Sequence, residues 1–151
     1  MIDSIKRLYN KHRSIILYIF WGGVTTLVSY STYFAARIGL VALTDEPPET
    51  AWILALATVI SWVIAVSVAF LTNKAYVFES KSWAFKTVRR EAAGFFAARL
   101  LSLALDAALT VLLVGLWLLN EPLSKIFINV IVLILNYAAS KFLIFKRHPG
   151  D

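Results

Sequence analysis

The chain has 151 residues, of which 60% are hydrophobic and 16% are charged, and its mean hydropathy is +0.74. Soluble domains contain about 45–50% apolar and about 25% charged residues. So short a chain leaves much of its surface exposed and cannot bury such an apolar excess in one core. The sequence has no cysteine, which excludes a disulfide-stapled module and any cysteine-based metal or redox site. Composition therefore excludes an ordinary soluble domain and a disordered chain, and indicates an integral membrane protein.

Four segments are long and apolar enough to cross a membrane, which requires about 20 residues each. Pro47 and Pro48 separate the first from the second, and Asn120-Glu121-Pro122 is expected to form a tight turn before the fourth. The predicted spans are residues 15–41, 51–72, 92–119 and 123–145, and residues 74–91 form the middle connection. The first apolar segment is too long for a cleaved signal peptide, so we expect it to be retained. The predicted fold class is an all-α membrane protein with four transmembrane helices.

Basic residues gather on one side of these spans. Twelve of the fifteen Lys and Arg residues lie in the N-terminal arm, the middle connection and the C-terminal end. The first loop has none and carries Asp45, Glu46 and Glu49. The positive-inside rule therefore places both termini in the cytoplasm. Residues 1–14 have apolar positions spaced as in an interfacial amphipathic helix, and residues 147–151 form a cytoplasmic tail.

The two halves of the chain resemble each other, which predicts two parallel repeats of two spans each. Lys-x-x-[Val/Ile]-Phe ends both the second and the fourth span. At an offset of 67 the sequence matches Phe70 with Tyr137, Lys74 with Lys141, and Phe78 with Phe145. The first and third spans match more loosely at an offset of 76, Phe20 with Phe96 and Thr26 with Ser102.

The third span contains Arg99, Ser102 and Asp106 on one helical face. A charge at the centre of a span costs about 2.5–3.5 kcal/mol on insertion scales, so such residues need a reason. Arg99 and Asp106 are separated by about 10 Å along the helix axis, which predicts a different partner for each. Substrate binding and hydrogen bonding between helices are both open interpretations.

Other spans also have polar faces. The face of the first span comprises Gly22, Thr26, Ser29, Tyr33 and Arg37. We favour helix packing for the first three, and headgroup contact or pairing with Asp45 or Glu46 for Arg37. The fourth span aligns Lys125, Asn129, Asn136 and Ser140, and the second aligns Thr58, Ser61, Ala65 and Thr72. A lined cavity, an interface and internal packing remain open for these two faces.

Several motifs together resemble the GtrA-like family of small four-span bacterial membrane proteins, across residues 15–146. They are Phe20-Trp21-Gly22-Gly23-Val24-Thr25-Thr26, Asn73-Lys74-Ala75-Tyr76-Val77-Phe78, Phe96-x-x-Arg99, and Asn136-Tyr137-x-x-Ser140-Lys141-x-x-Ile144-Phe145. The family usually has Arg where this chain has Lys74, which keeps the charge but loses the bidentate fork.

The resemblance implies a flippase in the bacterial inner membrane. Its substrate would be a polyprenyl-phosphate-linked sugar, used by membrane glycosyltransferases for cell-surface polysaccharide or teichoic acid glycosylation. The phosphate-binding candidates are Arg99, Lys74, Lys141, Asn73 and Ser140. The candidates for lining a polar or sugar-binding cavity are Asp106, Ser102, Asn136, Asn129, Thr26 and Ser29. Four spans enclose little space, so we also expect a homodimer.

No catalytic or metal-binding motif is present in the sequence. His12 and His148 both lie outside the predicted spans, so no Ser/His/Asp set can be assembled. We therefore predict no enzyme activity, no cofactor and no nucleic-acid partner. Two alternatives remain: a non-transporting adaptor for a glycosyltransferase, and a cation exporter like the small multidrug resistance family. The exporter would depend on Asp106, because the first span has no acidic residue.

Overall fold

The computed structural model describes the backbone of residues 2–145 and the side chains of residues 12–145, and within these residues all regular secondary structure is helical. The elements are α1 (Ile2–Thr44), α2 (Ala51–Thr72), η1 (Asn73–Val77), α3 (Phe85–Thr110), η2 (Val111–Leu116), α4 (Glu121–Ala139) and η3 (Ser140–Ile144), where η marks a π-helical turn. The all-helical prediction is thus confirmed for this part of the chain. The predicted tail at 147–151 and His148 lie outside the described residues.

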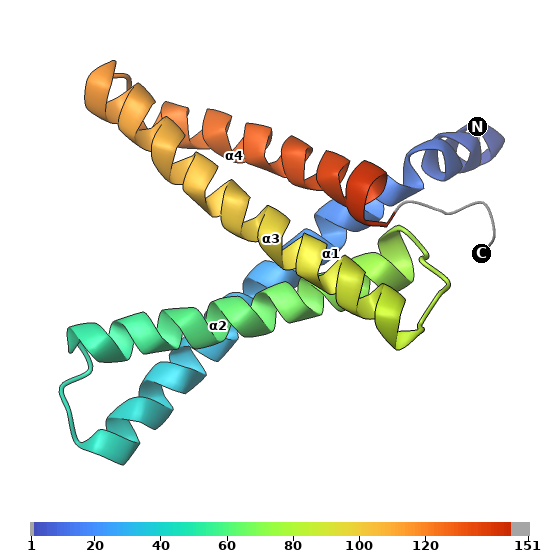
Figure 1. Ribbon diagram of the computed structural model, residues 1–151. Coiled ribbons are helices and arrows are strands. Elements are labelled where there is room, and N and C mark those ends of the chain that lie inside the picture. The colour runs from blue at the N-terminus through green and yellow to red at the C-terminus, as the bar shows by residue number, and fades with distance from the viewer. Residues whose placement is uncertain (1, 146–151) are drawn as a thin grey trace. The chain divides into compact units, whose positions relative to one another are not determined.

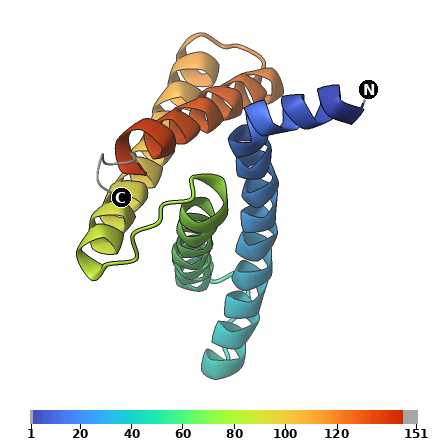
Figure 2. The ribbon, with the colours of Figure 1, turned by 90° about the vertical axis from the view of Figure 1, so that its right-hand side faces the viewer.

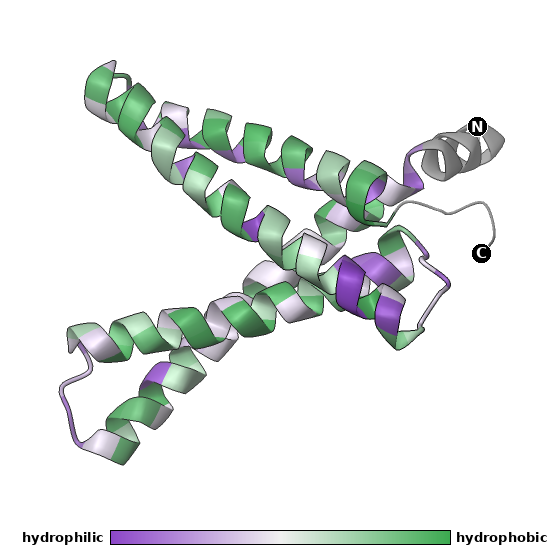
Figure 3. Ribbon diagram, in the orientation of Figure 1, coloured by the Kyte–Doolittle hydropathy of each residue, from purple (hydrophilic) through white to green (hydrophobic). Residues whose placement is uncertain are grey.

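Four helices are long and apolar enough to cross a membrane: His12–Thr44, Ala51–Val77, Phe85–Leu116 and Glu121–Ile144. Most large apolar side chains on them are exposed, as expected for surfaces that face lipid. The hydropathy colours of Figure 3 show apolar turns along most of each helix.

Two of the connections between spans differ from the sequence prediction. The middle connection, expected at 74–91, is helical at both ends, because η1 continues to Val77 and α3 begins at Phe85. The expected turn at Asn120-Glu121-Pro122 is already the start of α4. The Asn120 side chain caps that helix by accepting a hydrogen bond from Leu123 N at 3.2 Å, and Pro122 fits the first turn, where its missing N–H costs nothing.

The chain divides into two compact units, residues 1–79 and 80–151, and each contains one antiparallel pair of long helices. In the first unit α1 packs against α2 (Figure 1). Figure 2 shows α2 running beside α1 in a second view. The buried residues of α2 recur every four positions and are mostly small: Ile53, Ala57, Ser61, Ala65 and Ala69. Ser61, Ala65 and Thr72 therefore belong to internal packing, whereas Thr58 is exposed.

Three contacts attach the start of α1 to the end of this unit. Arg13 pairs with Glu79, Tyr18 lies against Phe78, and the ring of Trp21 stacks on Tyr76 with centroids 5.1 Å apart. Aromatic pairs of this kind contribute about 0.5–1.5 kcal/mol beyond the area they bury. They hold η1 against α1.

The second unit pairs α3 with α4, and η3 also contacts α3. Its last aromatic residue, Phe145, packs on Phe95 with ring centroids 6.1 Å apart. Phe145 follows η3 as Phe78 follows η1, and each contacts an aromatic residue on the first helix of its own unit.

A π-helical turn ends both units at positions related by the offset of 67. Phe78 N donates to Asn73 O, and Phe145 N donates to Ser140 O, each at 2.9 Å. Such i to i+5 turns are rare and often occur at functional sites. The first helix of the second unit ends in a further π-helical turn, η2, whereas α1 is α-helical throughout, so the correspondence is closest in the last helices.

Sidedness can be tested directly, because the native chain contains no cysteine. We expect Glu46→Cys to react with a membrane-impermeant maleimide added to intact cells, and Lys81→Cys to react only after lysis. Both positions are exposed on short connections. Lys81 lies in the basic middle connection, which the positive-inside rule places in the cytoplasm. The unsubstituted chain controls for background labelling. The opposite labelling pattern would place the termini outside the cell.

Candidate functional site: a lipid-facing groove and an intramembrane ion pair

A groove of about 740 Å³ lies along α3 and α4 in the second unit. Its walls are almost wholly apolar. The lining residues are Arg90, Gly94, Ala97, Ala98, Leu101, Ser102, Leu105, Leu135, Asn136, Ala138, Ala139, Phe142, Leu143 and Ile144. Alanine and glycine on the facing helices leave the space open, because larger side chains there would fill it. A groove of this volume is within the range of small-molecule sites.

Two polar side chains meet within the groove. Ser102 Oγ donates to Asn136 Oδ1 at 2.7 Å, which joins α3 to α4. Asn136 is buried and Ser102 is half-buried. Their hydrogen bond satisfies a pair of groups that would otherwise be costly in hydrocarbon. The amide N–H groups of Asn136 remain as donors that can turn to a ligand.

Positive charge marks the α3 start of the groove. Lys86, Arg89 and Arg90 all lie in the first two turns of α3, and Figure 3 shows this stretch as strongly hydrophilic. Cations are unfavourable near a helix N-terminus, because the helix macrodipole is positive there. Helix stability therefore does not account for these three residues. Arg90 alone among them lines the groove.

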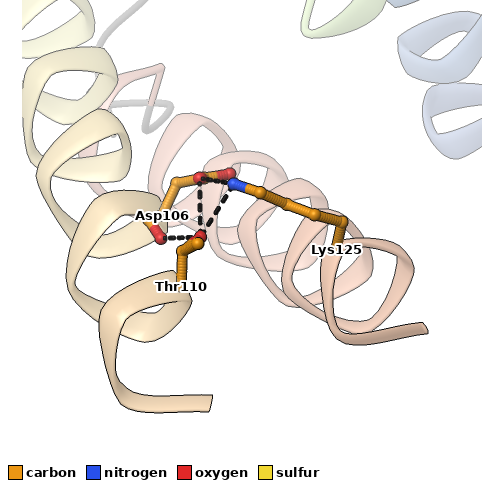
Figure 4. A network of polar contacts seen from close by, with 3 residues as sticks. All are labelled: Asp106, Thr110 and Lys125. Carbon is orange, nitrogen blue, oxygen red and sulfur yellow. Dashed lines mark hydrogen bonds and ion pairs between the residues drawn. The ribbon is translucent and has the colours of Figure 1, made fainter. Parts of the chain in front are cut away.

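A second polar cluster lies further along the same helix pair. Lys125 Nζ contacts Asp106 Oδ1 at 2.9 Å and donates to Thr110 Oγ1 at 2.7 Å (Figure 4). The Thr110 hydroxyl in turn donates to the Asp106 backbone carbonyl at 2.8 Å. The sequence predicted a partner for Asp106 other than Arg99, and Lys125 is that partner.

The predicted phosphate-binding residues are distributed over both units. Asn73 and Lys74 belong to η1 of the first unit, whereas Arg99, Ser140 and Lys141 belong to the second. Lys74 is completely buried, whereas Lys141 is exposed and donates to Tyr137 Oη at 3.2 Å. The two lysines that match in the sequence repeat thus occupy opposite environments.

The remaining phosphate-binding candidates have identifiable contacts. The Arg99 guanidinium lies 5.0 Å from the centre of the Phe95 ring. Ser140 is buried. Asn73 Nδ2 donates to Ala69 O at 2.7 Å, and among the described side chains its buried Oδ1 has no hydrogen-bond partner. That oxygen is available to accept a hydrogen bond.

The predicted cavity residues are only partly brought together. Ser102 and Asn136 meet in the groove, and Asp106 joins Lys125, but Asn129 is exposed. Thr26 and Ser29 lie on α1 in the first unit.

The favoured packing role of the first-span polar face is not what the structure shows. A side chain added at Gly22 would meet nothing within 4 Å, and Thr26 is exposed with its hydroxyl donating to its own helix at Gly22 O. Arg37 Nε donates to Pro48 O at 2.9 Å, and among the described residues it does not pair with Asp45 or Glu46. Its contact with lipid headgroups stays a prediction.

Sequence reasoning missed three residues of this region. Thr110 continues the spacing of Ser102 and Asp106 by one more turn, so the helical register would have indicated it. Arg90 was assigned to the connection, although it belongs to α3. Glu91 is a buried carboxylate that accepts from Ser80 Oγ at 2.9 Å, and its place in a basic segment concealed it. Within residues 12–145 no group of His, Cys, Asp and Glu forms a metal site.

A family model described as "GtrA/DPMS, transmembrane domain" matches residues 17–145. The chain belongs to this family. A GtcA protein of Listeria monocytogenes, named for cell wall teichoic acid glycosylation, is 37% identical over 145 residues and covers 96% of this chain and 93% of its own length. The corresponding protein of Listeria innocua is 36% identical, covering 97% and 94%. The membrane protein YwcD of Bacillus subtilis, described as uncharacterized, is 35% identical and covers 87% and 95%. No solved structure matches the chain.

Family membership and the four candidate spans make this a multi-pass membrane protein. Its intramembrane ion pair then has a measurable effect on stability. We expect Asp106→Asn and Lys125→Met each to lower the midpoint of thermal unfolding in detergent, because each leaves the other residue without its partner. The double variant should lose less than the sum of the two, with a coupling of about 0.5–3 kcal/mol.

Glu121→Gln, an exposed acidic residue on α4, is the matched control and should leave the midpoint nearly unchanged. Additive losses in the double variant would contradict an energetic role for the pair.

Proposed function

We propose that this GtrA-family protein moves polyprenyl-phosphate-linked sugars across the bacterial inner membrane for cell-surface polysaccharide or teichoic acid glycosylation. The observation that carries the proposal is the apolar groove of the second unit, with a cation at the α3 start and a polar pair within it. A polyprenyl phosphate has the same distribution of chemistry, a long branched hydrocarbon with an anion at one end. Similarity to GtcA proteins supports the link to teichoic acid glycosylation.

The groove suits the isoprenoid chain. Its apolar walls are formed by side chains such as Leu101, Leu135 and Phe142 on the helices that face lipid. Hydrocarbon in such a groove gains dispersion contacts with the helices while remaining in an apolar medium. Ser102 and Asn136 line the same groove and provide polar groups that can hydrogen-bond to the head group.

The phosphate is expected to bind on the cytoplasmic side, which the positive-inside rule assigns to the start of α3. Arg90 lies at the groove and carries the fork that binds phosphate oxygens in pairs. Arg99, Ser140 and Lys141 in the second unit remain proposed phosphate ligands, and so, separately, do Asn73 and Lys74 in the first. Basic groups between helices on the cytoplasmic side are known to hold lipid head groups. A second copy of the chain and a glycosyltransferase are the proposed partners.

The geometry disfavours the cation exporter. That function requires a carboxylate free to exchange a proton for a cationic substrate, but Asp106 lies 2.9 Å from the Lys125 ammonium. Lys125 would repel a cation at this site.

Lipid binding tests the role of Arg90. We expect Arg90→Gln to weaken retention of a polyprenyl phosphate by about three- to tenfold, because a charge-assisted contact is lost. The measurement is mass spectrometry of the lipid bound to the purified protein. Arg89→Gln is the matched control, since Arg89 is adjacent and exposed but does not line the groove. Equal losses in both variants would attribute the effect to net charge alone.

Transport tests the groove. Ala98→Phe should reduce the movement of a labelled polyprenyl-phosphate hexose across proteoliposomes about tenfold or more, because the ring occupies the groove. Ala104→Phe places the same ring on an exposed α3 position outside the groove and should transport normally. If the unsubstituted protein moves no more lipid than protein-free vesicles, the flippase function is wrong and the adaptor function remains.

A further inference from the structure

The cluster of Asp106, Thr110 and Lys125 is half-exposed, and Lys125 lies four residues after the start of α4. Asp106 is ten residues before the end of η2, which places it about 15 Å from that end of the helix. The exposed fractions of the two charged side chains are 28% for Asp106 and 40% for Lys125. A charge at such depth does not face hydrocarbon without a large penalty. The exposed side of the cluster therefore requires a polar occupant.

The cluster leaves an N–H donor and a carboxylate oxygen without a partner among the described residues. An ammonium group has three N–H donors, and two of those on Lys125 are used, by Asp106 Oδ1 and Thr110 Oγ1. The Thr110 hydroxyl donates its one hydrogen to the Asp106 backbone carbonyl, and Asp106 Oδ2 has no partner among the described residues. An unused N–H and an unused carboxylate oxygen thus belong to two groups in contact with each other.

An alcohol matches this pair, because a hydroxyl donates one hydrogen bond and accepts another. A phosphate does not match it, because Asp106 would repel the anion. A cation does not match it either, because Lys125 would repel it. The cluster therefore fits a neutral group that carries a hydroxyl better than it fits an ion.

We propose that Asp106 and Lys125, with Thr110 positioning the Lys125 ammonium, bind the carbohydrate part of the lipid substrate through its hydroxyl groups. This inference rests on the proposed function and adds two residues, Lys125 and Thr110, and a specificity to it. The cluster selects lipids that carry a sugar over the bare polyprenyl phosphate. Thr110 positions the Lys125 ammonium, while Asp106 and Lys125 make the contacts.

The site is separate from the phosphate site at the groove. Arg90 and Asp106 are sixteen residues apart on α3, which corresponds to about 24 Å along the axis. One sugar phosphate does not reach both. The two positions therefore hold the head group at successive stages of its passage, phosphate first near Arg90 and sugar later near Asp106.

Competition between two lipids tests this selectivity. The purified protein is offered equal amounts of a polyprenyl phosphate carrying one hexose and of the same polyprenyl phosphate without sugar, and both are quantified by native mass spectrometry. We expect the unsubstituted protein to prefer the sugar-carrying lipid, and Asp106→Asn and Lys125→Met to lose that preference about tenfold while still binding bare lipid. If the residues had a purely structural role, their substitution would reduce the bound amounts of both lipids together and leave the ratio of the two unchanged.

Two further variants keep the test decisive. Thr110→Val retains both charges and therefore the ion pair, so it can be measured even if the charge variants fail to fold. We expect it also to reduce the preference for the sugar-carrying lipid. Glu121→Gln, on the same helix as Lys125, is the control and should keep the preference for the sugar-carrying lipid. A preference in the unsubstituted protein that survives Asp106→Asn, Lys125→Met and Thr110→Val overturns the sugar site but not the flippase. Retention of neither lipid by the unsubstituted protein overturns both proposals.

Discussion

The whole structure depends on one constraint, that polar groups in hydrocarbon must find a partner or a polar space. Backbone groups meet it by forming four long helices. Hydroxyl side chains meet it locally, as when Thr32 and Ser67 donate to carbonyls one turn earlier in their own helices. Some charged and amide side chains, such as Asn73, also bond within their own helix, but others join two helices. The contacts of Asp106 with Lys125 and of Ser102 with Asn136 are the result.

The last helical turn of each unit contains a buried polar residue and is followed by a phenylalanine that packs on the first helix. A π-helical turn presents one extra residue per turn, and in both units a phenylalanine directly after it packs onto the first helix. The residues that begin these turns, Asn73 and Ser140, are both buried. Rigid helix ends with buried polar groups are suited to holding a head group, because the groups are already desolvated and positioned.

In the proposed function, the groove and the ion pair contact different parts of the lipid substrate. Small residues along α3 and α4 leave apolar space for a chain, Arg90 provides positive charge at one end, and the neutral pair of Asp106 and Lys125 provides open hydrogen-bonding valences further along. Each feature alone fits many ligands. Together they favour a lipid with an anion and a hydroxyl-rich head, which agrees with the teichoic acid glycosylation named for the GtcA relatives.

The sequence by itself determined the membrane class and the four helices, because these depend on composition and position along one chain. It also indicated the family through short motifs. Tertiary structure alone decided the pairings, since contacts between helices depend on rotation and axial stagger that no single segment encodes. Lys74 and Lys141 match in the repeat, yet one is buried and the other exposed. Likewise Asp106 required a neighbouring helix to identify Lys125 as its partner, and Arg90 became part of the groove only because α3 begins before it.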